Sequence, residues 1–110
     1  MDTGERNKFC LINITEAKNS VTIFLAGNFS FGAHRDFKVA YMKYLDNPDI
    51  GNIIINLSGV EYLDSSALGM LLLLRERTLA KNTNLFLSKP SGIVDRVFDL
   101  VGFPKLFTIN

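Results

Sequence analysis

The sequence contains no tryptophan, one cysteine and one histidine. The scarcity of these residues argues against several classes of protein. A lone cysteine, Cys10, cannot form a disulfide within the chain, so a reducing, cytoplasmic environment is expected. With His34 as the only imidazole, no zinc-type cluster can form unless carboxylates supply all the ligands. We therefore expect neither a metal nor a cofactor.

The sequence also lacks an excess of charge of either sign, and it lacks long apolar runs. Twelve basic and eleven acidic residues leave a net charge of +1, which gives no electrostatic footprint for nucleic acid or an anionic membrane. The longest apolar run, residues 67–74, is interrupted by Gly69 and is far too short to span a bilayer. The first residues lack the apolar core of a signal peptide. We expect a soluble cytoplasmic protein with no nucleic-acid and no membrane partner.

What is present is enough apolar material for one compact domain. The chain has 110 residues, 47% of them hydrophobic, which argues against disorder and leaves little room for a second domain. Residues 1–8 are polar and charged and are expected to form a flexible leader. Residues 9–110 are expected to form the domain.

The apolar pattern predicts strands and helices in alternation after an opening hairpin. A first helix, capped by Ser30, has its apolar residues from Ala33 to Leu45 on one face. A last helix is capped by Ser91 and has a buried stripe of Ile93, Val94, Val97, Phe98 and Val101. The expected strands are 9–17, 20–27, 52–58, 84–89 and 105–110, with a further helix at 65–80. This order predicts an α/β fold with a mixed sheet and helices packed on it.

The run 52–58 has apolar residues on both faces, which predicts a central strand covered on both sides. The next residues, "GVEYL" (59–63), are expected to form a turn. Binding sites of open α/β sheets lie at this end of the strands.

Two serines and an acid follow that turn, directly before an apolar helix. Asp64, Ser65 and Ser66 can serve as helix caps, because side-chain oxygens accept from the unpaired N–H groups of a first turn. A hydroxyl at this place is also exposed and could carry a phosphate, which would add about −1.5 to −2 charges to a docking surface. Both interpretations remain open from the residues alone. Phe29 and Phe31 are expected on a nearby loop, as core residues or as partner contacts.

Three stretches in the same order resemble the STAS domain and, within it, the bacterial anti-sigma factor antagonists. They are "LAGNFSF", "IIINLSGVEYLDSSALGMLLLL" and "VDRVFDLVGFPKLFTI". The resemblance implies a STAS fold in which Ser65 is phosphorylated, with Ser66 as the alternative, and in which Asp64 belongs to the recognition site. Ala67 stands where the family usually has glycine, which favours a stiffer helix entrance.

The resemblance implies a non-enzymatic switch. Unphosphorylated protein would bind an anti-sigma factor or a related serine kinase of the GHKL type, and a serine phosphatase would reset it. The chain would be a monomer or weak dimer. The alternative is a STAS scaffold module in which the serines are only caps.

Other chemistries lack their motifs. No glycine precedes the serines as a hydrolase elbow requires, and no phosphate-binding glycine loop supports a nucleotide or small-ligand site. The end of the central strand has Asn56 and Ser58 where a response-regulator receiver needs an aspartate.

Overall fold

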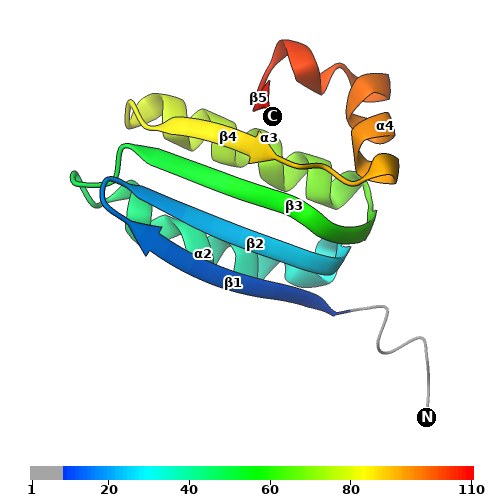
Figure 1. Cartoon of the computed structure of the whole chain (residues 1–110), viewed down its shortest axis with the longest axis horizontal. Helices are drawn as coiled ribbons and strands as arrows, with labels where there is room; N and C mark the ends of the chain where they lie inside the picture. The colour runs from blue at the N-terminus through cyan, green and yellow to red at the C-terminus, as the bar shows by residue number, and fades with distance from the viewer. Residues whose placement is uncertain (1–8) are drawn as a thin grey trace.

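Five strands form one mixed sheet, and their order in the sheet follows their order in the chain (Figure 1). β1 (Cys10–Ala17) and β2 (Ser20–Phe29) form the antiparallel hairpin that the sequence predicted. β3 (Asn52–Leu63), β4 (Asn84–Ser88) and β5 (Thr108–Ile109) then add in parallel. This computed structural model describes residues 9–110; the predicted flexible leader, residues 1–8, lies outside the described residues.

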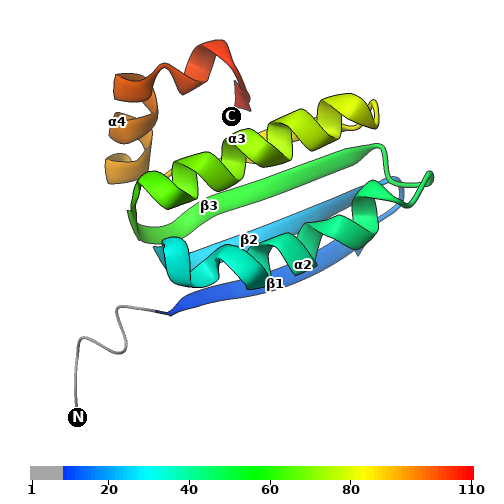
Figure 2. The ribbon, with the colours of Figure 1, turned by 180° about the vertical axis from the view of Figure 1, so that it is seen from behind.

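Two long helices cover one face of the sheet. α2 (His34–Leu45) and α3 (Ser65–Ala80) lie side by side there, as Figure 2 shows from the helix side. α4 (Gly92–Val101) lies at the end of the sheet where β3 ends and contacts that strand. Two 3₁₀ turns, η1 (Phe31–Ala33) and η2 (Phe103–Lys105), precede α2 and β5. The predicted α/β fold with a mixed sheet is therefore confirmed.

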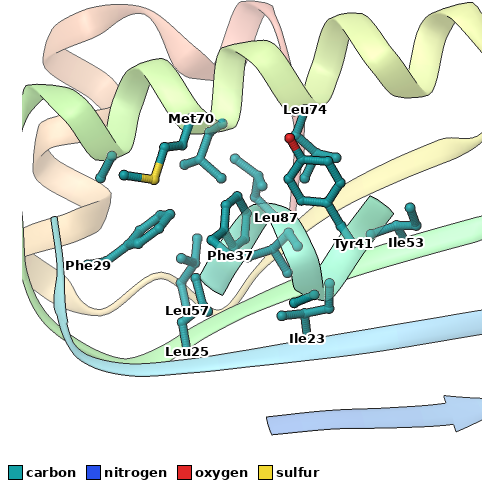
Figure 3. Close-up of a cluster of buried hydrophobic side chains, with 14 of the residues drawn as sticks. Ile23, Leu25, Phe29, Phe37, Tyr41, Ile53, Leu57, Met70, Leu74 and Leu87 are labelled. Carbon is teal, nitrogen blue, oxygen red and sulfur yellow. The ribbon is translucent and has the colours of Figure 1, made fainter. Parts of the chain in front are cut away.

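The core lies between the sheet and the two long helices (Figure 3). Alternate residues of the strands point into it, because side chains along a strand alternate between the two faces of the sheet. The apolar face predicted for the first helix is confirmed, since all six of its members are buried. The strand residues of the core are Val21, Ile23, Leu25, Phe29, Ile53, Ile55, Leu57, Val60 and Leu87. The helix face consists of Ala33, Phe37, Ala40, Tyr41, Tyr44 and Leu45.

The central strand departs from the prediction in two ways. Helices cover only one of its faces, and the other face of the sheet carries no helix in the described part of the chain (Figure 1). The expected turn at 59–63 is also wrong, because β3 continues to Leu63. Its last residues pair with the end of β2 across two register shifts, which lets the strand bend and carry the chain to α3.

Both predicted caps outside the site differ in detail. Ser30 precedes η1 and its side chain makes no capping hydrogen bond, and α2 begins only at His34. Ser91 does stand at the N-cap of α4, but its Oγ donates to the carbonyl oxygen of Val60 at 2.8 Å. This bond ties α4 to β3, so the hydroxyl serves a tertiary contact.

The last helix is less buried than predicted, and the last strand is shorter. Val94 and Phe98 are fully buried, whereas Ile93 and Val101 are 56% and 46% exposed. The predicted strand 105–110 shrinks to β5, because Phe103 begins a 3₁₀ turn and stacks on Phe98 with ring centroids 5.0 Å apart. Aromatic packing decides the local backbone here.

Candidate functional site

Asp64 joins the start of α3 to the segment that follows β2. One carboxylate oxygen, Oδ1, accepts from the backbone N–H of Ala67 at 3.0 Å, which is the N-cap bond that the sequence predicted. The other, Oδ2, accepts from the backbone N–H of Phe31 at 3.2 Å. Nothing in the sequence indicates this second bond, since the two residues are 33 positions apart. Asp64 therefore holds two segments of the site together.

Ser65 and Ser66 are the first two residues of α3. Ser65 is exposed and its Oγ forms no hydrogen bond with any described residue, whereas Ser66 is half-buried. The backbone N–H groups at these two positions have no partner within a helix. They also find none elsewhere in residues 9–110. An anion attached to Ser65 would thus meet free donors and the positive end of the helix dipole.

A groove runs between α2 and α3 next to these serines. Its volume is about 260 Å³. Phe31 of η1 and His34 at the start of α2 line it on one side, and Ser66 lines it from the start of α3. We call it the α2–α3 groove. Its lining residues are Phe31, His34, Phe37, Lys38, Tyr41, Ser66, Gly69, Met70 and Leu73.

The walls of the α2–α3 groove present apolar groups to solvent. Phe31 is 71% exposed, and its ring stacks against His34 with centroids 6.2 Å apart. Leu73 is 38% exposed on the α3 side. Gly69 faces open space, since a Cβ built there meets no atom within 4 Å. Neither Gly69 nor Leu73 was predicted as a site residue, although a glycine inside an otherwise strong helical pattern was the available signal.

The floor of the groove is held by a phenol and a guanidinium. The hydroxyl oxygen of Tyr41 accepts from Arg77 of α3 at 3.2 Å, and the same guanidinium lies 5.9 Å from the centre of the Tyr41 ring. Burial raises the pKa of the Tyr41 phenol, and the nearby Arg77 charge offsets part of that rise. These contacts fix the two helices against each other below the exposed residues. Figure 3 shows Tyr41, Phe37 and Met70 in this region.

Phe29 was expected on a loop, and that expectation is wrong. It is the last residue of β2, is fully buried, and packs edge-on against Phe37 with centroids 5.1 Å apart. The strand continues to this residue because Phe29 pairs with Leu63 of β3. Phe29 therefore belongs to the core, and only Phe31 of the pair reaches solvent.

Neither a metal centre nor a membrane span is found in the described residues. Between residues 9 and 110 no three His, Cys, Asp or Glu side chains gather in a way that could hold a metal ion. No helix of that range has the length and apolar character needed to cross a membrane. The site consists of an exposed hydroxyl, free helix N–H groups and an apolar groove. It suits attachment of an anion and docking of a protein surface.

Comparison with known proteins identifies the family of this domain. The model of the STAS domain family matches residues 12–110. The chain belongs to the STAS family. A STAS-domain-containing protein of Pseudomonas aeruginosa is 40% identical over 90 residues, which cover 82% of this chain and 87% of that protein.

Solved STAS structures share the same architecture. The anti-sigma factor antagonist SpoIIAA in its unphosphorylated form aligns with a TM-score of 0.77 and 21% identity, over 91% of this chain and 88% of its own. SpoIIAA of Bacillus in its phosphorylated form aligns with a TM-score of 0.72 and 20% identity, over 91% of both chains. An anti-sigma factor antagonist of Mycobacterium paratuberculosis aligns with a TM-score of 0.81 and 20% identity, over 93% of this chain and 86% of its own. At these identities the likeness shows the fold alone.

Proposed function

We propose that this STAS domain is an anti-sigma factor antagonist whose binding is switched off by phosphorylation of Ser65. The observation that carries the proposal is the exposed Ser65 hydroxyl on the first turn of α3, beside free N–H donors and the α2–α3 groove. Structural likeness to SpoIIAA, which has been solved with and without its phosphate, supports it.

In the unphosphorylated state the α2–α3 groove is the docking surface. Phe31 offers a large exposed ring there, and aromatic residues often dominate the binding energy of protein interfaces. Asp64 fixes the backbone of Phe31 through its 3.2 Å bond. The ring is thus pre-positioned relative to Ser65, which lowers the entropy lost on docking. The partner is an anti-sigma factor or a related GHKL-type serine kinase.

Phosphorylation changes the charge of this surface without unfolding it. A phosphate on Ser65 brings about −1.5 to −2 charges next to the Asp64 carboxylate. The free N–H groups and the helix dipole stabilise it on the domain. A partner surface that fits the unphosphorylated site must then desolvate a dianion. A loss of ~3–4 kcal/mol there weakens affinity several-hundred-fold.

The direct test uses charge variants at the two serines. Ser65→Ala should bind the anti-sigma partner as the unmodified chain does and resist phosphorylation, whereas Ser65→Glu should bind poorly by calorimetry. A negative residue on the first turn suits the helix dipole, so the Glu variant should not lose thermal stability. Ser66→Ala is the matched control and should still be phosphorylated and released. Mass spectrometry of the phosphopeptide then identifies the residue.

The outcomes separate a switch from a static module. Equal binding by Ser65→Ala and Ser65→Glu would contradict the switch and favour a scaffold in which the serines are only caps. Phosphate found on Ser66 would move the site by one residue and leave the mechanism in place. A serine phosphatase that restores binding would complete the cycle in the cytoplasm.

A further inference from the structure

Where the strands pair in regular register, the face of the sheet that the helices leave bare contains no charged side chain among the described residues. The far end of β3 (residues 57–63), where register shifts with β2 interrupt the alternation, contains the exposed Glu61 and is not counted as part of this face. Alternation along the strands places on it the residues that pair across the sheet but point away from the core. We call this set the open face. It consists of Leu11, Asn13, Thr15, Ala17, Ser20, Thr22, Phe24, Ala26, Asn52, Ile54, Asn56, Asn84, Phe86, Ser88 and Thr108.

This composition differs from that of an ordinary wet surface. The whole chain is 21% charged, and about 25–35% charged residues is the range recommended for a soluble designed surface. The centre of the open face is a cross-strand row of Thr22, Ile54 and Phe86. Parallel sheets are normally covered on both faces. β2 to β5 form the parallel part of this mixed sheet, and its bare, uncharged face therefore suits contact with another apolar surface.

Several polar groups of the open face are already satisfied within the chain. The Asn84 amide Nδ2 donates to Asn52 Oδ1 at 3.0 Å. Asn56 Oδ1 accepts from the backbone N–H of Ser58 at 3.0 Å. At one corner, Ser88 Oγ donates to Oδ1 of Asn110 at 2.7 Å. Covering polar atoms that are already hydrogen-bonded costs far less than covering free ones.

We propose that the open face is the interface of a homodimer, in which two copies pack sheet against sheet about a two-fold axis. An uncharged face meets a copy of itself without like-charge repulsion, and two-fold interfaces use the same patch on both subunits. A shallow hollow, lined in part by Ile54 and Phe86, can receive side chains of the second copy. Sheets pack in this way about 10 Å apart.

The size of the face sets the strength of the dimer. The strands lie about 4.8 Å apart and rise about 3.3 Å per residue, so the roughly 30 strand residues behind the open face cover about 480 Å² in projection, or about 500 Å² of surface per copy. The pair would bury about 1,000 Å², the lower limit of specific interfaces. The dimer is therefore weak and forms at high protein concentration. It leaves Ser65 and the α2–α3 groove free, because these lie on the helix side (Figure 2).

The test is sedimentation velocity of the full chain from low micromolar to near-millimolar concentration. Wild type should shift from monomer to dimer across this range. Thr22→Lys, at the centre of the face, should raise the dissociation constant at least tenfold, because each copy would bury an unpaired charge. Asn13→Lys lies on the same face at an exposed position of β1 and should raise it as well, without risk to the core.

Controls keep the result specific. Leu79→Lys changes a 61% exposed residue of α3 on the helix side and should dimerise like wild type, as should Ser65→Glu. Circular dichroism verifies that each variant is folded. If the wild type stays monomeric over the whole concentration range, the proposal is wrong, and the open face would instead contact a different molecule. Dimers unaffected by both open-face lysines, or equally weakened by Leu79→Lys, would also overturn it. None of these results bears on the Ser65 switch.

Discussion

We expect Gly69 to make the domain less stable than alanine would at the same position. Its missing side chain leaves space in the α2–α3 groove. Gly69 lies inside the long helix α3, and an ideal Cβ built there meets no atom within 4 Å. Glycine inside a helix is about 0.8–1.0 kcal/mol less favourable than alanine. Since the added methyl group neither clashes nor packs, Gly69→Ala should stabilise the fold by about that amount. For a domain of this size the melting temperature should rise by about 4 °C.

Thermal unfolding followed by circular dichroism measures this gain, and Gly102→Ala is its matched control. A Cβ at Gly102 also meets nothing within 4 Å, but its φ of 79° lies in the left-handed region. Alanine there should therefore destabilise by about 1 kcal/mol. The two substitutions are chemically identical and should have opposite signs. Destabilisation by Gly69→Ala would show that the space beside α3 is not open, and would refute the groove at this position.

The same variant separates stability from docking. The methyl group that Gly69→Ala adds would project into the α2–α3 groove, so partner binding should weaken while the fold becomes more stable. Calorimetric titration of the anti-sigma partner into both forms measures the difference. Unchanged affinity in the stabilised variant would remove this part of the groove from the docking surface.

Three further substitutions test contacts of the site and the core. Phe29→Ala should destabilise by about 3–5 kcal/mol in urea unfolding, whereas the 71% exposed Phe31 should tolerate alanine within about 0.5 kcal/mol and lose only partner binding. Asp64→Ala should lose about 1–2 kcal/mol, because the N–H groups of Ala67 and Phe31 lose their acceptor, and Asp64→Asn should recover part of it. The hydrogen bond from Tyr44 to Glu16 raises the pKa of the Tyr44 phenol. The unfolded chain therefore loses this proton first, so stability should fall as pH rises above about 10, and Tyr44→Phe should flatten that fall in chemical denaturation.

The sequence could predict elements whose signal is local. The period of the first helix placed six residues in the core, and all are buried there. The cap at Asp64 followed from its position before an apolar run and is present at 3.0 Å. Both depend on interactions within a few residues along the chain. Such patterns are visible without any tertiary information.

What the sequence could not predict depends on distant partners. "GVEYL" was predicted as a turn because it begins with a glycine and follows the central strand, yet pairing with the end of β2 makes it strand. The hydroxyl of Ser91 has the position of a cap, yet it donates to the carbonyl of Val60, which is far away in the sequence. Phe29 and Phe31 are two positions apart and equally apolar. Phe29 is buried because β2 continues to it and pairs with Leu63, whereas Phe31 lies beyond the strand in η1 and is exposed.

Because the strand order in the sheet repeats the order of synthesis, each strand after the first pairs with one that has already been made. The hairpin β1–β2 can form first, and β3, β4 and β5 then add at a single advancing edge without displacing anything. Assembly on the ribosome can thus proceed in one direction, from the amino end. The two-residue strand β5 is added last, and we expect it to be the first strand to detach from the folded sheet.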